Sequence, residues 1–205
     1  MSNFLKTNDP RLILTGGLFA IAWLWFKISK MSQKQTTSFK LRLARAADAP
    51  AIHRVMTAAF EAVSDRGLFF ADDEVFIRQH LADRGFILVA LRADEIVGFI
   101  IARLPGLDED NLGRELGLAE PELAKVAHLE SVAVLPSYQG EGLGCLLMAR
   151  AEERLIKDRF TWLMATVAPG NLPSLHNFQA LGYRIMATKL KYGGLPRHIL
   201  LKEVS

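Results

Sequence analysis

A glycine-rich hexapeptide, QGEGLG at residues 139–144, has the composition of a phosphate-binding turn. It follows an alternating apolar segment and precedes an amphipathic one, which predicts a strand, a turn and a helix in that order. Backbone N–H groups in such a turn converge at the positive end of the helix dipole, and glycine lets an anion approach the main chain closely. No Lys-Ser/Thr pair follows Gly144, and the turn lies too far along the chain for a first Rossmann turn. Nucleoside triphosphates and NAD are therefore disfavoured.

Side chains near this turn are candidates for proton transfer or nucleophilic attack. Strand alternation predicts that His128, Glu130, Val132 and Val134 share one face of the preceding strand. The alternative to a role in proton transfer is a structural one, in which Glu130 pairs with a neighbouring Lys or Arg and His128 is a hydrogen-bonded edge histidine. Cys145 would start the following helix, where a thiolate is favoured, but its apolar neighbours are also typical of a small core residue.

Composition excludes several classes of protein. The chain has a single cysteine, so it has no internal disulfide framework or cysteine-based zinc cage, and we expect no metal and a cytoplasmic location. The formal charge of +3 arises within the first thirty residues, which hold four basic residues and one acidic residue (4 − 1 = +3). The rest of the chain is neutral and has no Lys/Arg-rich run, so we expect no nucleic-acid binding.

Residues 12–26, LILTGGLFAIAWLWF, form an uncharged apolar stretch. The stretch is short for a membrane-spanning helix, which needs about 20 residues. Either it anchors the chain to a membrane, with the domain on the cytoplasmic face by the bias of flanking positive charges, or the functional chain starts at Met31. We expect membrane contact only in the first case. The predicted organisation is an apolar segment at 1–30, a polar linker at 31–39 and a domain at 40–205.

Hydrophobic periodicity within the domain predicts strands interspersed with helices. The first predicted strand begins at residue 40, and the others lie at 86–91, 96–102, 128–135, 162–167, 183–190 and 199–203. The predicted helices lie at 48–60, 73–81, 143–156 and 174–181. The segment 105–125 is predicted to be a long loop with one helical turn near 120–124. It carries two basic and six acidic residues (2 − 6 = −4), so it is either an acidic rim that steers a cationic amine or an ordinary solvated loop.

These features together resemble the GNAT superfamily of acyl-CoA N-acyltransferases. The family signature is Gln/Arg, two residues, Gly, one residue, Gly/Ala, and Gln139, Gly142 and Gly144 match it. The preceding HLESVAVLPSY is similar to the fourth strand of the family. The resemblance covers about residues 40–205. It implies an α/β fold with a mixed, mostly antiparallel sheet that is splayed between strands four and five and flanked by about four helices.

The resemblance also implies acetyl-CoA as the acyl donor, bound between the splayed strands. Main-chain groups of Val132 and Val134 would align the pantetheine arm, and the N–H of Val134 would polarise the thioester carbonyl. The remaining coenzyme contacts that the resemblance implies come from Gln139, Gly140, Gly142, Leu143, Gly144 and Asn171.

Relatives such as arylalkylamine N-acetyltransferases place base residues where this chain has His128 and Glu130, and we expect Glu130 to be the main base. A later family motif, Asn-x-x-Ala/Ser-x-x-x-Tyr, is matched from Asn171 to Phe178, but Phe178 replaces the Tyr that is the usual general acid. The resemblance implies direct transfer of an acetyl group to a primary amine of a small molecule or peptide. The alternative is a non-catalytic acyl-CoA-binding sensor module with the same fold. The chain is compatible with a homodimer, and the acceptor, the acyl chain length and the general acid stay open.

Overall fold

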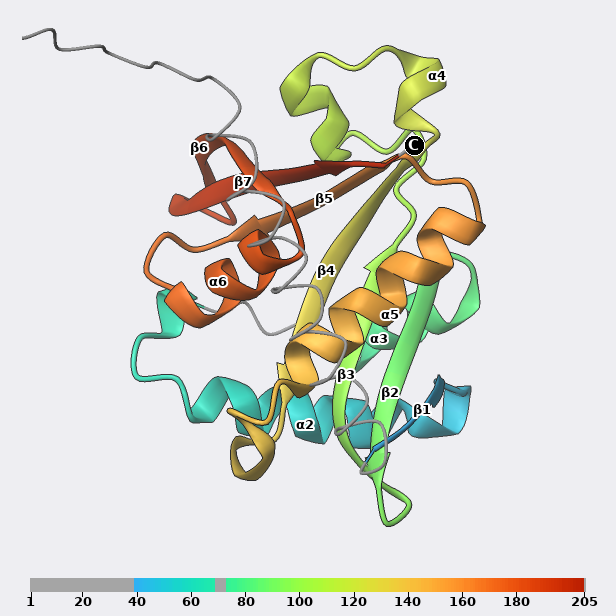
Figure 1. Ribbon diagram of the computed structural model, residues 1–205, viewed down its shortest axis with the longest axis vertical. Helices are drawn as coiled ribbons and strands as arrows, with labels where there is room; N and C mark the ends of the chain where they lie inside the picture. Colours follow the sequence, from blue (N-terminus) through green and yellow to red (C-terminus); the bar gives the residue numbers. More distant parts are fainter. Residues whose placement is uncertain (1–38, 69–72, 205) are drawn as a thin grey trace, which may run out of the picture. The chain divides into compact units, whose positions relative to one another are not determined.

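A seven-stranded mixed sheet forms the centre of the fold (Figure 1). The structure, a computed structural model, describes residues 39–68 and 73–204. The strand order is β1-β2-β3-β4-β5-β7-β6, and among the described strands only β4 and β5 pair in parallel. The strands are β1 (Lys40–Leu43), β2 (Gly85–Arg92), β3 (Glu95–Arg103), β4 (Val126–Val134), β5 (Trp162–Val167), β6 (Arg184–Lys191) and β7 (Leu195–Glu203).

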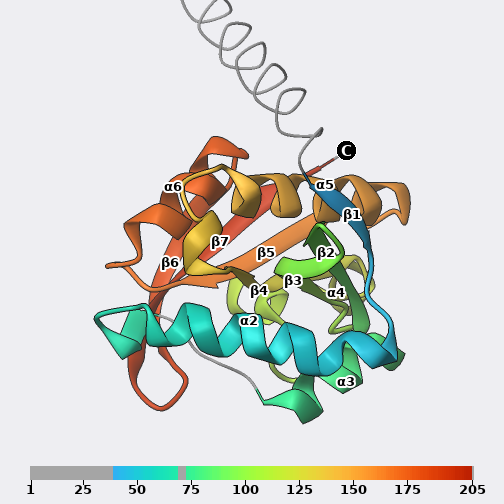
Figure 2. The same cartoon turned by 90° about the horizontal axis from the view of Figure 1, so that it is seen from below.

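Helices cover both faces of this sheet, with α2 and α3 on one side and α5 and α6 on the other (Figure 2). The long connection between β3 and β4 carries α4 and the 3-10 helix η4 (Figure 1). The helices are α2 (Ala49–Glu61), α3 (Glu74–Ala82), α4 (Glu120–Leu123), α5 (Leu143–Lys157) and α6 (Leu172–Ala180), and the 3-10 helices are η2 (Ala46–Asp48), η3 (Arg66–Leu68), η4 (Leu112–Leu116) and η5 (Pro136–Tyr138).

Two layers of apolar side chains hold the helices to the sheet. Phe99 of β3 is fully buried in a cluster with Ile52 and Met56 of α2. On the opposite face, the Cα of Gly98 leaves room for α5, since a Cβ at this position would lie 3.3 Å from the side chain of Leu147. The strand β3 therefore packs against a different helix on each of its faces.

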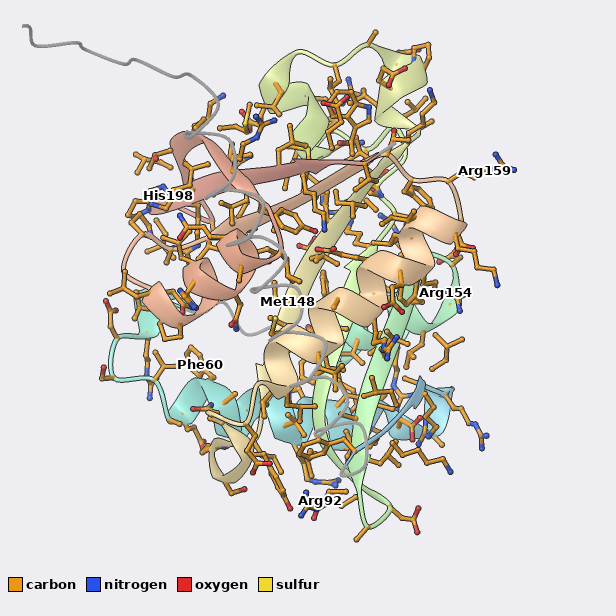
Figure 3. All side chains as sticks on the ribbon, viewed as in Figure 1. Phe60, Arg92, Met148, Arg154, Arg159 and His198 are labelled. Carbon is orange, nitrogen blue, oxygen red and sulfur yellow. The ribbon has the colours of Figure 1, made fainter. Side chains whose placement is uncertain are left out.

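The C-terminal half of α5 is attached to the sheet by a different kind of contact. Arg154, labelled in Figure 3, extends from α5. Its guanidinium lies 4.8 Å from the ring centroid of Phe86 on β2. A guanidinium over an aromatic ring is attracted by the electron-rich face of the ring, while its stem covers apolar surface. This contact fixes α5 across β2 as well as β3.

Local sequence explains where several elements begin and end. Ala93 and Asp94 between β2 and β3 have φ values of 47° and 67°, as a two-residue turn with the twist of a hairpin requires. The carboxylate of Asp73 accepts the Phe76 N–H at 2.8 Å and caps α3. After α6, Gly182 adopts a φ of 92°, which a residue with a side chain rarely does.

The predicted α/β fold and its order of elements are confirmed. The bounds differ slightly, because β4 begins at Val126 rather than 128 and β7 at Leu195 rather than 199. The helical turn expected near 120–124 is α4, whereas η4 was not predicted. Predictions for residues 1–38, including the apolar stretch 12–26, concern residues outside the described part of the chain.

Within residues 39–68 and 73–204, no helix is both long enough and apolar enough to cross a lipid bilayer.

Candidate functional site

The two parallel strands of the sheet separate soon after they meet. β4 and β5 are paired only from Val126 opposite Trp162 to His128 opposite Met164, although both strands continue. Figure 1 shows the two strands diverging from this paired end. The splay between strands four and five that the family resemblance implied is therefore confirmed. Among the described strands, none pairs with the later residues of β4 on the β5 side.

Main-chain groups of Val132 and Val134 point towards this opening. The Leu135 N–H donates to the Val97 carbonyl at 2.9 Å, so this is a hydrogen-bonded pair of the antiparallel ladder. Hydrogen-bonded and non-hydrogen-bonded pairs alternate along an antiparallel ladder. Val134 opposite Gly98 and Val132 opposite Ile100 are therefore non-hydrogen-bonded pairs. The N–H and C=O groups of both valines are therefore directed away from β3, towards the side on which β5 lies.

The glycine-rich turn follows β4 directly and opens α5. Gly140 and Gly142 have φ values of 81° and 77°, in the left-handed region that favours glycine. Gly142 is the N-cap of α5, no side chain caps the helix, and the first helical bond runs from Leu146 N–H to Gly142 C=O at 3.0 Å. The first-turn N–H groups of α5 have no acceptor within the helix, and they lie at the positive end of its dipole, where an anion is favoured.

Two other residues of the predicted coenzyme site are tied to the scaffold. The side-chain amide of Gln139 donates to the Val134 carbonyl at 3.2 Å and so links the glycine turn to the end of β4. Asn171 accepts the Ser174 N–H at 3.2 Å and donates to the Leu68 carbonyl at 3.3 Å. Asn171 therefore caps α6 and connects it to the segment after α2.

The predicted common face of the four β4 residues is wrong, because β4 contains a bulge. Its register against β3 shifts between Leu129 and Ser131, so Glu130 is an extra residue with no opposite partner. Val132 and Val134 lie opposite Ile100 and Gly98, on the α5 face of the sheet.

His128 lies on the other face of the sheet. It is opposite Arg103 on β3 and beside Met164 on β5. Glu130 contacts His128 and therefore lies on the same face. The bulge thus turns the two titratable side chains to the face opposite α5, while the main chain beside them still borders the opening.

The hydrogen bonds of His128 define its tautomer. Its ring is buried, and Nε2 accepts the Leu112 N–H at 3.1 Å. A neutral ring with an accepting Nε2 carries its proton on Nδ1, and Nδ1 lies 3.5 Å from Oε2 of Glu130. Because the Nε2 lone pair is occupied, His128 is placed to orient Glu130 rather than to remove a proton from a substrate. This differs from the expectation that His128 is itself a base.

Glu130 is surrounded by positively charged or protonatable groups. Burial acts to raise the pKa of Glu130, but His128, Arg103 and His80 together hold it below its ordinary value. The side chain of Glu130 is partly buried and keeps 19% of its surface exposed. It is therefore an ionised carboxylate at neutral pH that solvent or a substrate can still reach.

A cavity of about 300 Å³ lies next to Glu130. It is bordered by β3, β4 and β5, by the loop before η4, and by the turn between β6 and β7. Its polar side chains are those of Arg103, Asp110, His128, Glu130, Thr166, Lys191 and Tyr192. Sequence reasoning did not find Arg103, Thr166 or Lys191, because each comes from a strand with no local motif.

The acidic loop 105–125 is mostly neutralised by the protein itself. Asp108 and Asp110 pair with Arg103, whose guanidinium contacts Asp110 at 2.6 Å and Asp108 at 2.9 Å. Glu115 contacts both Lys189 and Lys191, and Glu122 lies 3.2 Å from Lys125 Nζ. These pairs leave less negative charge for steering than the composition of the loop suggests.

The side chains near the predicted general-acid position and at the start of α5 are poorly suited to proton or acyl transfer. Phe178 and Tyr183 are both buried and pack edge to face, with ring centroids 5.0 Å apart. Burial raises the pKa of Tyr183 well above its ordinary value. Burial also raises the pKa of the Cys145 thiol, and the nearby Glu152 adds to this effect, so the thiolate expected at a helix start is disfavoured.

A sheet that splays between its two parallel strands, beside a glycine-rich helix start, defines the class of GNAT-type acetyltransferase folds. The chain matches the Acetyltransferase (GNAT) family over residues 49–183, and it belongs to this family. No significant match to a curated protein was found.

Solved structures with the same fold are distant in sequence. A ribosomal-protein-alanine N-acetyltransferase from Brucella melitensis is 23% identical, with a TM-score of 0.63, and the match covers 80% of this chain and 99% of that chain. The yncA protein of Salmonella typhimurium, solved with its cofactor acetyl-CoA, is 19% identical, with a TM-score of 0.63 and coverage of 82% and 94%. A paia N-acetyltransferase from Thermoplasma acidophilum in complex with coenzyme A is 15% identical, with a TM-score of 0.60 and coverage of 82% and 99%.

Proposed function

We propose that the protein transfers an acetyl group from acetyl-CoA to a primary amine of a small molecule or peptide, by direct attack of the amine on the thioester. Family membership supports N-acetyltransferase activity, and two of the structural neighbours contain acetyl-CoA or coenzyme A. The observation that carries the proposal is the direction of the Val132 and Val134 main-chain groups. They face the side on which β5 diverges, between the glycine turn that follows β4 and the cavity beside Glu130.

The glycine turn fits the pyrophosphate of the coenzyme. A diphosphate is anionic, and the uncapped N–H groups at the start of α5 together with Gly140 and Gly142 provide donors without intervening side chains. A Cβ at Gly144 would have only an ordinary contact of 3.7 Å, so this position tolerates alanine, as the family signature also does. The pantetheine arm would then align with β4, where the Val134 N–H is available to polarise the thioester carbonyl.

Glu130 would remove the proton that the amine must lose. A primary amine is mostly an ammonium ion at neutral pH, and only its neutral form attacks a carbonyl carbon. The ionised Glu130 carboxylate can take this proton directly or through a water molecule. His128 holds the carboxylate in place through Nδ1, and no side chain is required to form a covalent bond with the acetyl group.

A direct assay tests the proposal. The purified protein is incubated with acetyl-CoA and a panel of amines while free thiol is followed, and coenzyme binding is measured separately. Thiol release that depends on one class of amine supports the proposal. Coenzyme binding without thiol release above background for any amine would contradict it and would favour the alternative.

The alternative is an acyl-CoA-binding sensor without turnover. The observation that favours it is Phe178, which stands where the family motif usually has the Tyr that serves as general acid. The buried ring of Phe178 has no proton to donate. Coenzyme A thiolate can leave without enzymatic protonation near its own pKa, so loss of this Tyr does not prevent transfer. We therefore keep acetyl transfer as the proposed function.

A further inference from the structure

Arg197 is a buried cation that lacks a counter-ion among the described residues. It has 4% of its surface exposed, and its Nη1 donates to the Pro196 carbonyl at 2.9 Å. Its Nη2 is buried and has no hydrogen-bond partner. Buried arginines are rare unless they are paired, and an unsatisfied N–H of a charged group is costly in free energy. A residue of this kind points to a ligand that supplies the missing acceptor.

The strand register places Arg197 on the same face as the cavity. Ile199, two residues further along β7, lies opposite Thr166, which lines the cavity. Alternation along a strand puts Arg197 on the same side as Ile199. The neighbouring His198 is on the other side by the same alternation, and its Nδ1 lies 2.8 Å from Thr188 Oγ1.

Tyr192 connects Arg197 with the cavity. Its ring centroid lies 5.5 Å from the guanidinium carbon of Arg197, and its hydroxyl lies 3.0 Å from Thr166 Oγ1. Tyr192 lines the cavity, is 44% exposed and occupies a turn with a φ of 51°. Arg197 does not itself line the cavity, so a ligand there would reach its Nη2 only when the partly exposed Tyr192 ring moves aside.

The charges around the cavity are arranged with opposite signs at its two ends. At the β4 end Glu130 is a carboxylate. The Arg103 guanidinium beside it already forms ion pairs with Asp108 and Asp110. The β6–β7 end holds three cations, Lys189, Lys191 and Arg197, and one carboxylate, that of Glu115. The net formal charge there is 3 − 1 = +2. A molecule with an ammonium group at one end and an anion at the other matches this distribution.

We propose that the acetyl acceptor is an amino acid, or a similarly small amine that carries a carboxylate, and that Arg197 and Lys191 bind this carboxylate while the amine faces Glu130. The inference rests on the proposed function for the identity of the site as an acceptor site. A planar guanidinium suits a carboxylate, which can accept two parallel hydrogen bonds from it. A cavity of about 300 Å³ lies at the small end of ligand pockets, which suits such an acceptor.

Equilibrium binding tests this inference without any need for turnover. The protein saturated with coenzyme A is titrated calorimetrically with α-amino acids and with their carboxamides, which keep the amine and lose the carboxylate. We expect at least one amino acid to bind about tenfold or more tightly than its carboxamide. In Arg197→Met this preference should fall about tenfold, as expected for loss of a hydrogen bond between charged groups, while carboxamide binding stays unchanged.

Two further variants distinguish binding from folding. Lys191→Met changes a partly exposed side chain and should also reduce the preference, whereas Arg184→Met removes an exposed charge of β6 and should leave it unchanged. Equal binding of amino acids and carboxamides by the wild type would overturn the inference. So would an unchanged preference in Lys191→Met and in an Arg197→Met protein that still binds coenzyme A. If selective binding is found but no amine is acetylated, the proposed function fails and the carboxylate site stands.

Discussion

Nδ1 of His128 lies 3.5 Å from Oε2 of Glu130, on the face of the sheet opposite α5. The contact exists because the β4 bulge inserts Glu130 without an opposite partner, while His128 is held from its other side by the Leu112 N–H. A loop amide therefore sets the tautomer of a histidine, and the histidine orients a carboxylate beside the cavity. This chain of contacts gives the proposed base a fixed position on a rigid strand.

Glu130→Gln should lower turnover far more than coenzyme affinity. Glutamine keeps the size of the side chain but cannot accept a proton, so we expect kcat to fall roughly 10²-fold or more. The measurements are steady-state thiol release and calorimetric binding of coenzyme A. Glu153→Gln is the matched control, because Glu153 is 62% exposed on α5 and pairs with Arg150. Wild-type turnover in Glu130→Gln would remove Glu130 from the mechanism.

His128→Phe should shift the pH dependence of the reaction. Burial acts to raise the pKa of Glu130 and His128 acts to lower it, so loss of the imidazole should raise this pKa. The base form of Glu130 would then appear only at higher pH, and the acid limb of kcat/KM should move upward in pH. His128→Gln, which can still accept from Leu112 and donate to Glu130, should restore much of the wild-type profile. An acid limb that stays in place in His128→Phe would exclude a role for His128 in positioning Glu130.

Much of the coenzyme side of the site could be predicted from the sequence, because it depends on local patterns. The alternation before the glycines predicted β4, and the amphipathic period after them predicted α5. Gly140 and Gly142 adopt the positive φ values that make glycine necessary there. Main-chain groups make up this part of the site, so the fold alone positions them.

The acceptor side could not be predicted in the same way. Simple alternation failed at Glu130, because a bulge depends on the pairing of β4 with β3 and leaves no clear signal in β4 alone. Arg103 and Lys191 meet in one cavity only after strands distant in the sequence have paired. The charge of the 105–125 loop was likewise misleading, since its carboxylates have partners on β3 and β6 that the composition does not reveal.

Gly142→Asp should abolish coenzyme binding. The substitution places a negative side chain at the N-cap of α5, against the anion that the helix start is expected to bind. Aspartate at a φ of 77° is also strained, so a control must share that strain. Gly117→Asp is matched, because Gly117 has a φ of 74° and ends η4, away from the glycine turn. We expect Gly117→Asp to bind coenzyme A by calorimetry, and binding by Gly142→Asp would contradict the assignment of the glycine turn.

Arg103→Met should destabilise the protein in a pH-dependent way. The Arg103 side chain is 10% exposed, and its guanidinium holds the pKa of Asp110 below the ordinary value. A carboxylate whose pKa is lowered by folding adds stability above its unfolded pKa of about 4, and this stability is lost as the pH falls through the folded value. The wild type should therefore exceed Arg103→Met by about 1–2 kcal/mol in free energy of unfolding at pH 7, since Asp110 is 65% exposed and partly screened. Urea unfolding between pH 7 and pH 3 should show this difference shrinking, with a smaller effect in Arg84→Met, whose side chain is 51% exposed. A difference that stays constant across this range would mean that the contribution of Arg103 comes from packing rather than from its ion pairs.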